Sequence, residues 1–176
     1  MSDASGRRSI VQTDLAISVR RASGADAPAV AELVNRAYAI ESFFVDGDRT
    51  DAREIRGMIE RGVFVILEHS GGLAAAVYVE LSGYFGMLAV HPDFQKHGLG
   101  KRLVRIAEAL CESAGCTQMS LRIINLREEL ARWYRSLGYA EVGTTPYEHR
   151  PVKLPCHFVE MRKSLRPGVG AGAVAA

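Results

Sequence analysis

One stretch of the chain combines residue types that suit the binding of a phosphorylated ligand. An apolar run, Met87–Val90, leads into a loop that contains Gly98 and Gly100, and a segment with helical periodicity follows. The first backbone N–H groups of a helix have no intrahelical partner and carry the positive end of the helix dipole, so they attract anions such as pyrophosphate. Glycine lets such an anion approach the main chain. Three basic residues add positive charge nearby: Lys96, Lys101 and Arg102.

Three phosphate-binding motifs compete for this loop. A P-loop requires glycine at position 95 and serine or threonine at position 102, where this chain has Gln95 and Arg102. A dinucleotide-binding fingerprint that starts at Gly98 requires glycine or alanine at position 103, where Leu103 stands. The pattern that remains is Gln95-x-x-Gly98-x-Gly100.

This pattern resembles the acetyl-CoA motif of the GNAT superfamily of N-acetyltransferases. In that family a strand ending in L-x-V-x-P precedes the motif, as Leu88, Val90 and Pro92 do here. Further along, Leu130–Tyr139 is similar to a second family segment, and the resemblance covers roughly Ile17 to Met161. It implies an α/β fold with α+β layering: a mixed central sheet of about seven strands, flanking helices, and a splay between the fourth and fifth strands that admits the cofactor.

The resemblance also implies a co-substrate and roles for particular residues. Acetyl-CoA is the expected acyl donor, and no metal is expected. Tyr134 occupies the position of the tyrosine that protonates the departing CoA thiolate in many relatives; a phenol with a pKa near 10 can do this for a thiol with a pKa near 8.5. Many relatives carry asparagine where this chain has Arg127, and Asn125 is the candidate to replace it. The expected cofactor-binding residues are Leu88, Ala89, Val90, Gln95, Lys96, His97, Gly98, Leu99, Gly100, Lys101 and Asn125.

The general base is left open by the sequence. Many relatives have an acidic residue early in the fourth strand, where this chain has Tyr84 and Phe85. Glu80, at the end of the preceding strand, is the first candidate and Glu41 is the second. A bound water that passes the proton to solvent is the third. For either carboxylate, the sequence favours a solvated surface position over a catalytic one.

The acetyl acceptor is expected to be a small molecule with a primary amine. The segment Glu41–Glu54 is rich in carboxylates, whose field would attract a cationic amine, and the loop Thr144–Cys156 is expected to lie beside it. Arg150 and Lys153 in that loop favour an acceptor that also carries an anionic group. Two alternatives remain: an acetyltransferase that acts on a peptide or protein amine, and a CoA-binding regulatory module without turnover.

Composition excludes several other functions. The formal net charge of 176 residues is +2, without the dense basic face that nucleic acid binding requires. The longest apolar runs are too short for a membrane span, and the three cysteines form no CxxC pair. We therefore expect a cytoplasmic protein with no nucleic-acid or membrane partner, and we keep a homodimer among the expected assemblies.

The elements that must position these residues follow from the hydrophobic periods. One N-acetyltransferase domain is expected over 15–165, with flexible tails over 1–14 and 166–176. Tyr84–Val90 is expected to be a central strand buried on both faces. A helix that carries Val30 to Ala37 is expected, with Ser23 or Asp26 as its N-cap. Further helices are expected around 51–60, 98–114 and 127–136, and the other strands around 17–19, 62–69, 73–81, 119–124, 139–142 and 157–161.

Overall fold

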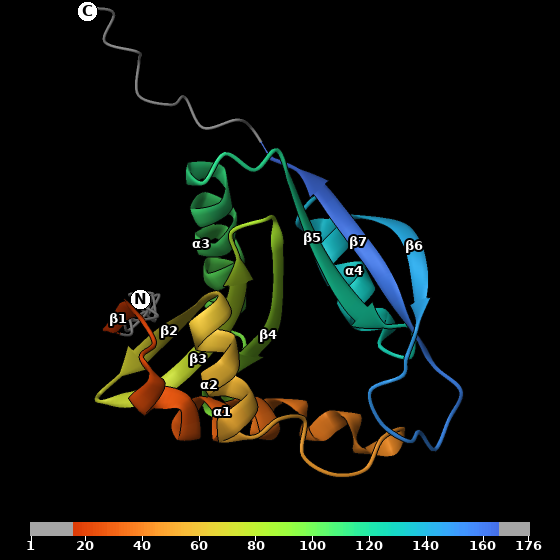
Figure 1. Ribbon diagram of the computed structural model, residues 1–176, viewed down its shortest axis with the longest axis horizontal. Helices are drawn as coiled ribbons and strands as arrows, with labels where there is room; N and C mark the ends of the chain where they lie inside the picture. Colours follow the sequence, from red (N-terminus) through yellow and green to blue (C-terminus); the bar gives the residue numbers. More distant parts are fainter. Residues whose placement is uncertain (1–15, 166–176) are drawn as a thin grey trace, which may run out of the picture.

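The computed structural model describes residues 16–165, so the two expected tails, 1–14 and 166–176, lie outside the described residues. The element order matches the sequence prediction (Figure 1). A short 3-10 helix, η2 (Ala39–Phe43), follows the first α-helix. The helices of the described part are α1 (Ala27–Tyr38), α2 (Ala52–Arg61), α3 (Leu99–Ser113) and α4 (Glu128–Ser136). The strands are β1 (Ile17–Arg21), β2 (Val63–His69), β3 (Gly72–Glu80), β4 (Tyr84–Val90), β5 (Gln118–Ile124), β6 (Ala140–Pro146) and β7 (His157–Ser164).

The strands form one mixed sheet in the order β1-β2-β3-β4-β5-β7-β6. All neighbours are antiparallel except β4 and β5, which are parallel and are paired only at Tyr84 and Ser120. Beyond that pair the two strands diverge toward their carboxyl ends, as Figure 1 shows. The expected splay between the fourth and fifth strands is therefore confirmed, and it opens where helices α3 and α4 begin.

Alternating side chains of the sheet build a core on each face. In β2, Val65 and Leu67 belong to the core on the face covered by α3 and α4, whereas Phe64 and Ile66 belong to the core on the face of α1 and α2. All four side chains are buried. Because successive side chains of a strand point to opposite faces, an apolar run can serve both cores at once.

Strand β4 is less buried than the sequence predicts. Phe85 and Ala89 are each 1% exposed, but Gly86, Met87 and Leu88 between them are only partly buried. The expectation of a strand covered on both faces is therefore wrong for the middle of β4. The reason is tertiary: the divergence of β5 removes the neighbour that would cover it.

Helix α3 begins as its sequence indicates. Gly98 is the N-cap with a φ of 78°, in the left-handed region that glycine adopts without steric cost. The stripe Leu99, Leu103 and Ala107 is buried against the sheet, which fixes the direction in which the helix N-terminus points. Within residues 16–165, no helix combines the length and apolar character needed to cross a membrane.

Candidate active site

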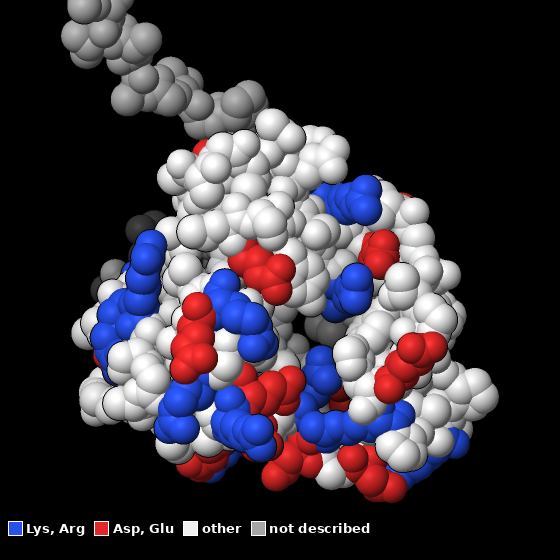
Figure 2. Space-filling view, in the orientation of Figure 1, with Lys and Arg blue, Asp and Glu red and all other residues white. Residues whose placement is uncertain are grey.

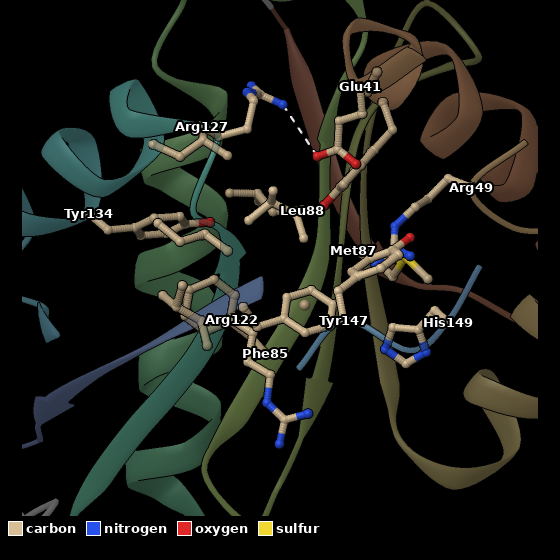
Figure 3. Close-up of a pocket in the computed structure, with 18 of the residues that line it drawn as sticks. Glu41, Arg49, Phe85, Met87, Leu88, Arg122, Arg127, Tyr134, Tyr147 and His149 are labelled. Carbon is tan, nitrogen blue, oxygen red and sulfur yellow. Dashed lines mark hydrogen bonds and ion pairs between the residues drawn. The ribbon is translucent and has the colours of Figure 1, made fainter. Parts of the chain in front are cut away.

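A cavity of about 180 Å³ lies where the sheet splays. Its walls come from the middle of β4, from β5, from the start of α4, and from segments near η2 and the β6–β7 loop. Figure 2 shows this face of the molecule hollowed between the two halves of the sheet, with basic and acidic side chains near the rim. Figure 3 shows the cavity from inside, with Leu88 in its centre between Tyr134 on one side and Arg49 on the other.

The backbone of β4 is irregular at this cavity. Ala76 of β3 is opposite Ala89, and Tyr78 is opposite Gly86, so β4 has one residue more than β3 over this stretch. The extra residue is accommodated at Met87, whose φ of 49° lies in the left-handed region. Met87 and Leu88 have no registered partner on β3 or on β5, and both residues line the cavity.

Tyr134 of α4 lies on the cavity wall and is 5% exposed. Its hydroxyl points toward Leu88 in Figure 3. Burial raises the pKa of Tyr134 well above its ordinary value, and the neighbouring phenols of Tyr38 and Tyr84 add to this. The side chain therefore stays protonated at neutral pH and can donate a proton into the cavity. Tyr134 also packs against Phe85 and Tyr139, so its ring contributes to the core as well.

Glu41 is the acidic side chain that the structure places in the same cavity. It is 7% exposed and forms an ion pair with Arg127, with 3.4 Å between Oε1 and Nη1. Burial raises the pKa of Glu41, while the charges of Arg49 and Arg127 act in the opposite direction. A carboxyl with a raised pKa accepts a proton more readily near neutral pH than an exposed one does.

Glu80 lies elsewhere. It pairs with Tyr84 at the start of β4 and lines an adjoining, more open hollow together with Tyr78 and Arg122, the last of which also lines the cavity of Tyr134. Glu80 is not among the residues that line the cavity of Tyr134. Of the two carboxylates suggested by the sequence, the geometry thus brings Glu41, not Glu80, into the cavity of the tyrosine.

The expected cofactor seat lies next to the cavity at the start of α3. The N–H of Arg102 donates to the carbonyl of Gly98, so the preceding amides of the first turn have no partner within the helix. Leu88 lines the cavity, Val90 packs near Gly100, and the side chains of Ala89 and Leu99 are buried in the core, which leaves only their backbone for a ligand. The loop side chains are exposed: Gln95, Lys96, His97 and, in the first turn of the helix, Lys101.

Asn125 is engaged in a structural contact. Its Oδ1 accepts a hydrogen bond from the backbone N–H of His157, 2.9 Å away, and its own N–H donates to the carbonyl of His157. These bonds fasten the end of β5 to the start of β7. The position seven residues before the tyrosine is filled by Arg127, whose guanidinium binds Glu41 and Glu129.

The two segments expected to form the acceptor pocket do meet at the cavity. Val45 and Val152 form an antiparallel bridge, and the N–H of Lys153 donates to the carbonyl of Phe44. The carboxylates of the first segment are largely occupied by protein contacts: Asp46 pairs with Lys153, Asp51 caps α2, and Glu54 accepts from Thr50.

Sequence reasoning did not identify several cavity-lining residues. Among them are Tyr38, Arg49, Tyr84, Arg122, Tyr147 and His149. Arg49, Tyr147 and His149 lie inside the two segments expected to form the acceptor pocket, but no motif distinguished them from their neighbours in the sequence. Among residues 16–165 no group of three or more histidine, cysteine or acidic side chains could hold a metal ion.

Comparisons with known proteins agree with this fold. Residues 60–141 match the model of the acetyltransferase (GNAT) domain, and no curated protein matches the chain. Among solved structures, the ribosomal-protein-S18-alanine N-acetyltransferase of Escherichia coli is 21% identical with a TM-score of 0.71, over 91% of this chain and 99% of that one.

Two further solved structures extend the comparison. A ribosomal-protein-alanine N-acetyltransferase of Brucella melitensis is 17% identical with a TM-score of 0.70, over 84% of this chain and 99% of that one. A GNAT superfamily phosphinothricin acetyltransferase of Sinorhizobium meliloti, in complex with acetyl-CoA, is 16% identical with a TM-score of 0.67, over 89% of this chain and 92% of that one. The family match over residues 60–141, the seven-stranded mixed sheet and the splay between β4 and β5 together support the GNAT superfamily for this chain.

Proposed function

We propose that the protein is an acetyl-CoA-dependent N-acetyltransferase that acetylates a primary amine by direct attack on the thioester. One observation carries the proposal: the buried hydroxyl of Tyr134 and the bulged backbone of β4 at Met87–Leu88 face the same cavity, beside the N-terminus of α3. A proton donor, open main-chain groups and an anion-attracting helix end are what transfer from a CoA thioester requires. The acetyl-CoA complex of the Sinorhizobium phosphinothricin acetyltransferase supports the choice of acyl donor.

The chain's own residues fit the two ends of such a donor. The first-turn amides of α3 after Gly98 would bind the pyrophosphate, and a shallow groove along that helix is lined by Lys101, Arg102 and Arg105, which suit further phosphate. Bound acetyl-CoA supplies an acyl group already activated as a thioester. At the cavity, the N–H of Leu88 would donate to the carbonyl oxygen as negative charge develops there.

Two side chains would move protons in this reaction. Glu41 would accept the proton of the attacking amine, and Tyr134 would donate its proton to the departing sulfur. The raised pKa of Glu41 matches its role, because it makes Glu41 a better proton acceptor than an exposed carboxylate, and the phenol of Tyr134 is protonated at neutral pH. Glu80 and a water remain the alternatives to Glu41 as the base.

We propose a small-molecule acceptor. The cavity beside Tyr134 is only about 180 Å³, and Tyr38, Arg49 and Tyr147 line its acceptor side. The name of the Sinorhizobium enzyme supports a small acceptor, whereas the names of the Escherichia and Brucella enzymes support a protein N-terminus. We also propose the cytoplasm as the location, in keeping with the free thiols of Cys111, Cys116 and Cys156. A homodimer stays a prediction.

The test measures CoA thiol release from acetyl-CoA with separate panels of amino acids, polyamines, aminoglycosides and lysine peptides. Thiol release that depends on an amine, and that falls in Tyr134→Phe, is the expected result. If the protein binds acetyl-CoA but no amine raises thiol release above hydrolysis, it is a CoA-binding module and the proposed activity is wrong. If only peptides are acetylated at useful kcat/KM, the small-molecule part is wrong.

A further inference from the structure

The arginines around the cavity differ in whether they form ion pairs with carboxylates. Arg127 is paired with Glu41 and Glu129, and Arg122 is paired with Glu160, with 3.4 Å between its Nε and Oε1. Arg49 projects into the cavity from the side opposite Tyr134 (Figure 3). Within residues 16–165 its guanidinium has no carboxylate partner, and its buried Nε has no hydrogen-bond acceptor.

The position of Arg49 is fixed by its surroundings. Its backbone carbonyl accepts a hydrogen bond of 2.9 Å from Arg150, and the next residue, Thr50, is held by two hydrogen bonds of 2.9 Å to the side chain of Asn35. The guanidinium carbon lies 5.5 Å from the centre of the Tyr38 ring. The ring packs against one face of the guanidinium but accepts none of the hydrogen bonds that its N–H groups donate in the plane. These in-plane N–H groups can therefore donate to a ligand.

Arg49 also joins three hollows on the acceptor side. It lines the cavity of Tyr134, a second cavity of about 270 Å³ that shares Tyr38, Glu41 and Tyr147 with the first, and the open hollow that contains Glu80. Arg150 lines the second and third of these, and it too has no carboxylate partner in the described chain. Carboxylates line the outer hollows as well, Asp48 in the second and Glu54 and Glu80 in the third. In the cavity of Tyr134 itself, the ion pairs of Arg122 and Arg127 leave the positive charge of Arg49 as the unpaired charge among the described lining residues.

A cationic amine alone gains nothing from the positive charge of Arg49. A guanidinium with an unpartnered buried Nε is costly unless a ligand completes its hydrogen bonds. A carboxylate matches the planar fork of arginine with two parallel hydrogen bonds, which a neutral amide or a second cation does not.

From these contacts we infer that the acceptor is an amino acid whose free carboxylate binds Arg49, so that its amine lies between Arg49 and Tyr134 near Glu41. The inference rests on the proposed acetyltransferase function and specifies its substrate class. It also separates free amino acids from protein N-termini, because the α-carboxyl group of an N-terminal residue is a neutral peptide amide.

The experiment compares each of the twenty proteinogenic L-amino acids with its α-carboxamide, using CoA thiol release. For the preferred amino acid, the wild-type protein is expected to show a kcat/KM about 10- to 100-fold higher than for the amide, the range for hydrogen bonds to a charged group. In Arg49→Gln this acid-over-amide ratio is expected to fall close to one. Arg53→Gln is the matched control, since Arg53 is an exposed arginine of α2 outside the cavity, and it is expected to keep the wild-type ratio.

Binding provides a readout that does not depend on turnover. Calorimetric titration of the preferred amino acid into the CoA-loaded protein is expected to lose about 10- to 100-fold in affinity in Arg49→Gln. Acetyl-CoA affinity, measured separately, is expected to be unchanged. If amides are acetylated as well as acids, or if Arg49→Gln keeps the ratio, the carboxylate site is wrong while the acetyltransferase function stands. If amino acids bind through Arg49 but no acetyl group is transferred, the proposed function fails and the binding site stands.

Discussion

Glu41 and Arg127 are joined across the splay of the sheet, with 3.4 Å between Oε1 and Nη1. They lie 86 positions apart in the chain, Glu41 in η2 after α1 and Arg127 directly before α4. Their side chains are 10% and 14% exposed, so the pair is largely withdrawn from water. It links the half of the molecule built on β1–β4 to the half built on β5–β7, at the point where main-chain pairing between the halves is absent.

Glu41→Gln is expected to lower kcat/KM by about 10²–10⁴-fold, the range for loss of a general base. A base acts in its ionised form, so wild-type activity rises with pH as Glu41 loses its proton. This rise is the acid limb of the pH–activity profile. Because burial raises the pKa of Glu41, the acid limb lies at higher pH than it would for an exposed glutamate. Kinetic pH profiles at saturating acetyl-CoA should show the limb in the wild type and not in the variant.

Arg127→Gln is a second test of Glu41 as the proton acceptor. Arg127 lowers the pKa of Glu41, so its removal is expected to move the acid limb to higher pH. A role limited to holding the two halves together would reduce activity at every pH without moving the limb. If the pH–activity profiles of Glu41→Gln and Arg127→Gln both run parallel to that of the wild type, Glu80 or a water accepts the proton of the amine.

Tyr134→Phe is expected to reduce turnover by about 10²–10⁴-fold with little change in acetyl-CoA affinity, because only the proton donor is removed. Single-turnover kinetics and calorimetry separate the two effects. Tyr139→Phe is the matched control: its ring lies 5.8 Å from that of Tyr134, but its hydroxyl donates to Glu108 outside the cavity. If Tyr134→Phe turns over as fast as the wild type under conditions where chemistry limits the rate, Tyr134 only packs in the core and does not donate the proton.

The parts of the fold that were predictable are those encoded by local pattern. The stripe Leu99 and Leu103 identified α3, and Gly98 marked its start, because helix periodicity and a left-handed cap are properties of a few adjacent residues. Strand β6 was predicted too short: it runs to Pro146, and its side chains are mostly exposed. An edge strand with little buried surface has no apolar alternation by which its length could be recognised.

The acceptor side was less predictable for a different reason. Glu41, Arg49, Arg127 and Tyr147 are brought together by the splay and by the bridge between Val45 and Val152, not by spacing. Acidic residues close together in the sequence suggested a negative field, but the fold occupies most of them with lysine, threonine and helix-cap contacts. What governs the charge of a pocket is which groups remain unpaired, and that depends on tertiary contacts.

Asp26→Ala is expected to lower the free energy of unfolding by about 1 kcal/mol at pH 7, a typical value for loss of a cap. Asp26 accepts hydrogen bonds from the N–H and hydroxyl of Ser23 and pairs with Arg20. These contacts hold its pKa well below the ordinary value, with Arg20 as the main cause. The stabilisation is therefore full above the unfolded-state pKa, about 3.9, and is lost as the pH falls below it.

Denaturant unfolding of the wild type and Asp26→Ala at pH 7 and at acidic pH measures this contribution. The difference in free energy of unfolding between the wild type and Asp26→Ala should become smaller at low pH. Asp46→Ala is the control, because Asp46 is paired with Lys153 but its side chain is 81% exposed, so the free energy of unfolding should change by less than about 0.5 kcal/mol. If this difference is the same at both pH values, the charge of Asp26 does not contribute to the stability of the fold.

Gly100→Asp is expected to weaken acetyl-CoA binding at least about tenfold while the protein stays folded. A Cβ at Gly100 would lie 3.6 Å from Trp133 and 3.7 Å from Val90, which is ordinary contact, and a carboxylate in the first turn of α3 suits the helix dipole. The same carboxylate repels a pyrophosphate bound to the adjacent amides, so the loss should diminish as salt screens the charge. Calorimetric titration at two ionic strengths measures it, with Gly100→Ala as the control for added bulk. If folded Gly100→Asp binds acetyl-CoA as Gly100→Ala does, the pyrophosphate does not sit at this helix end.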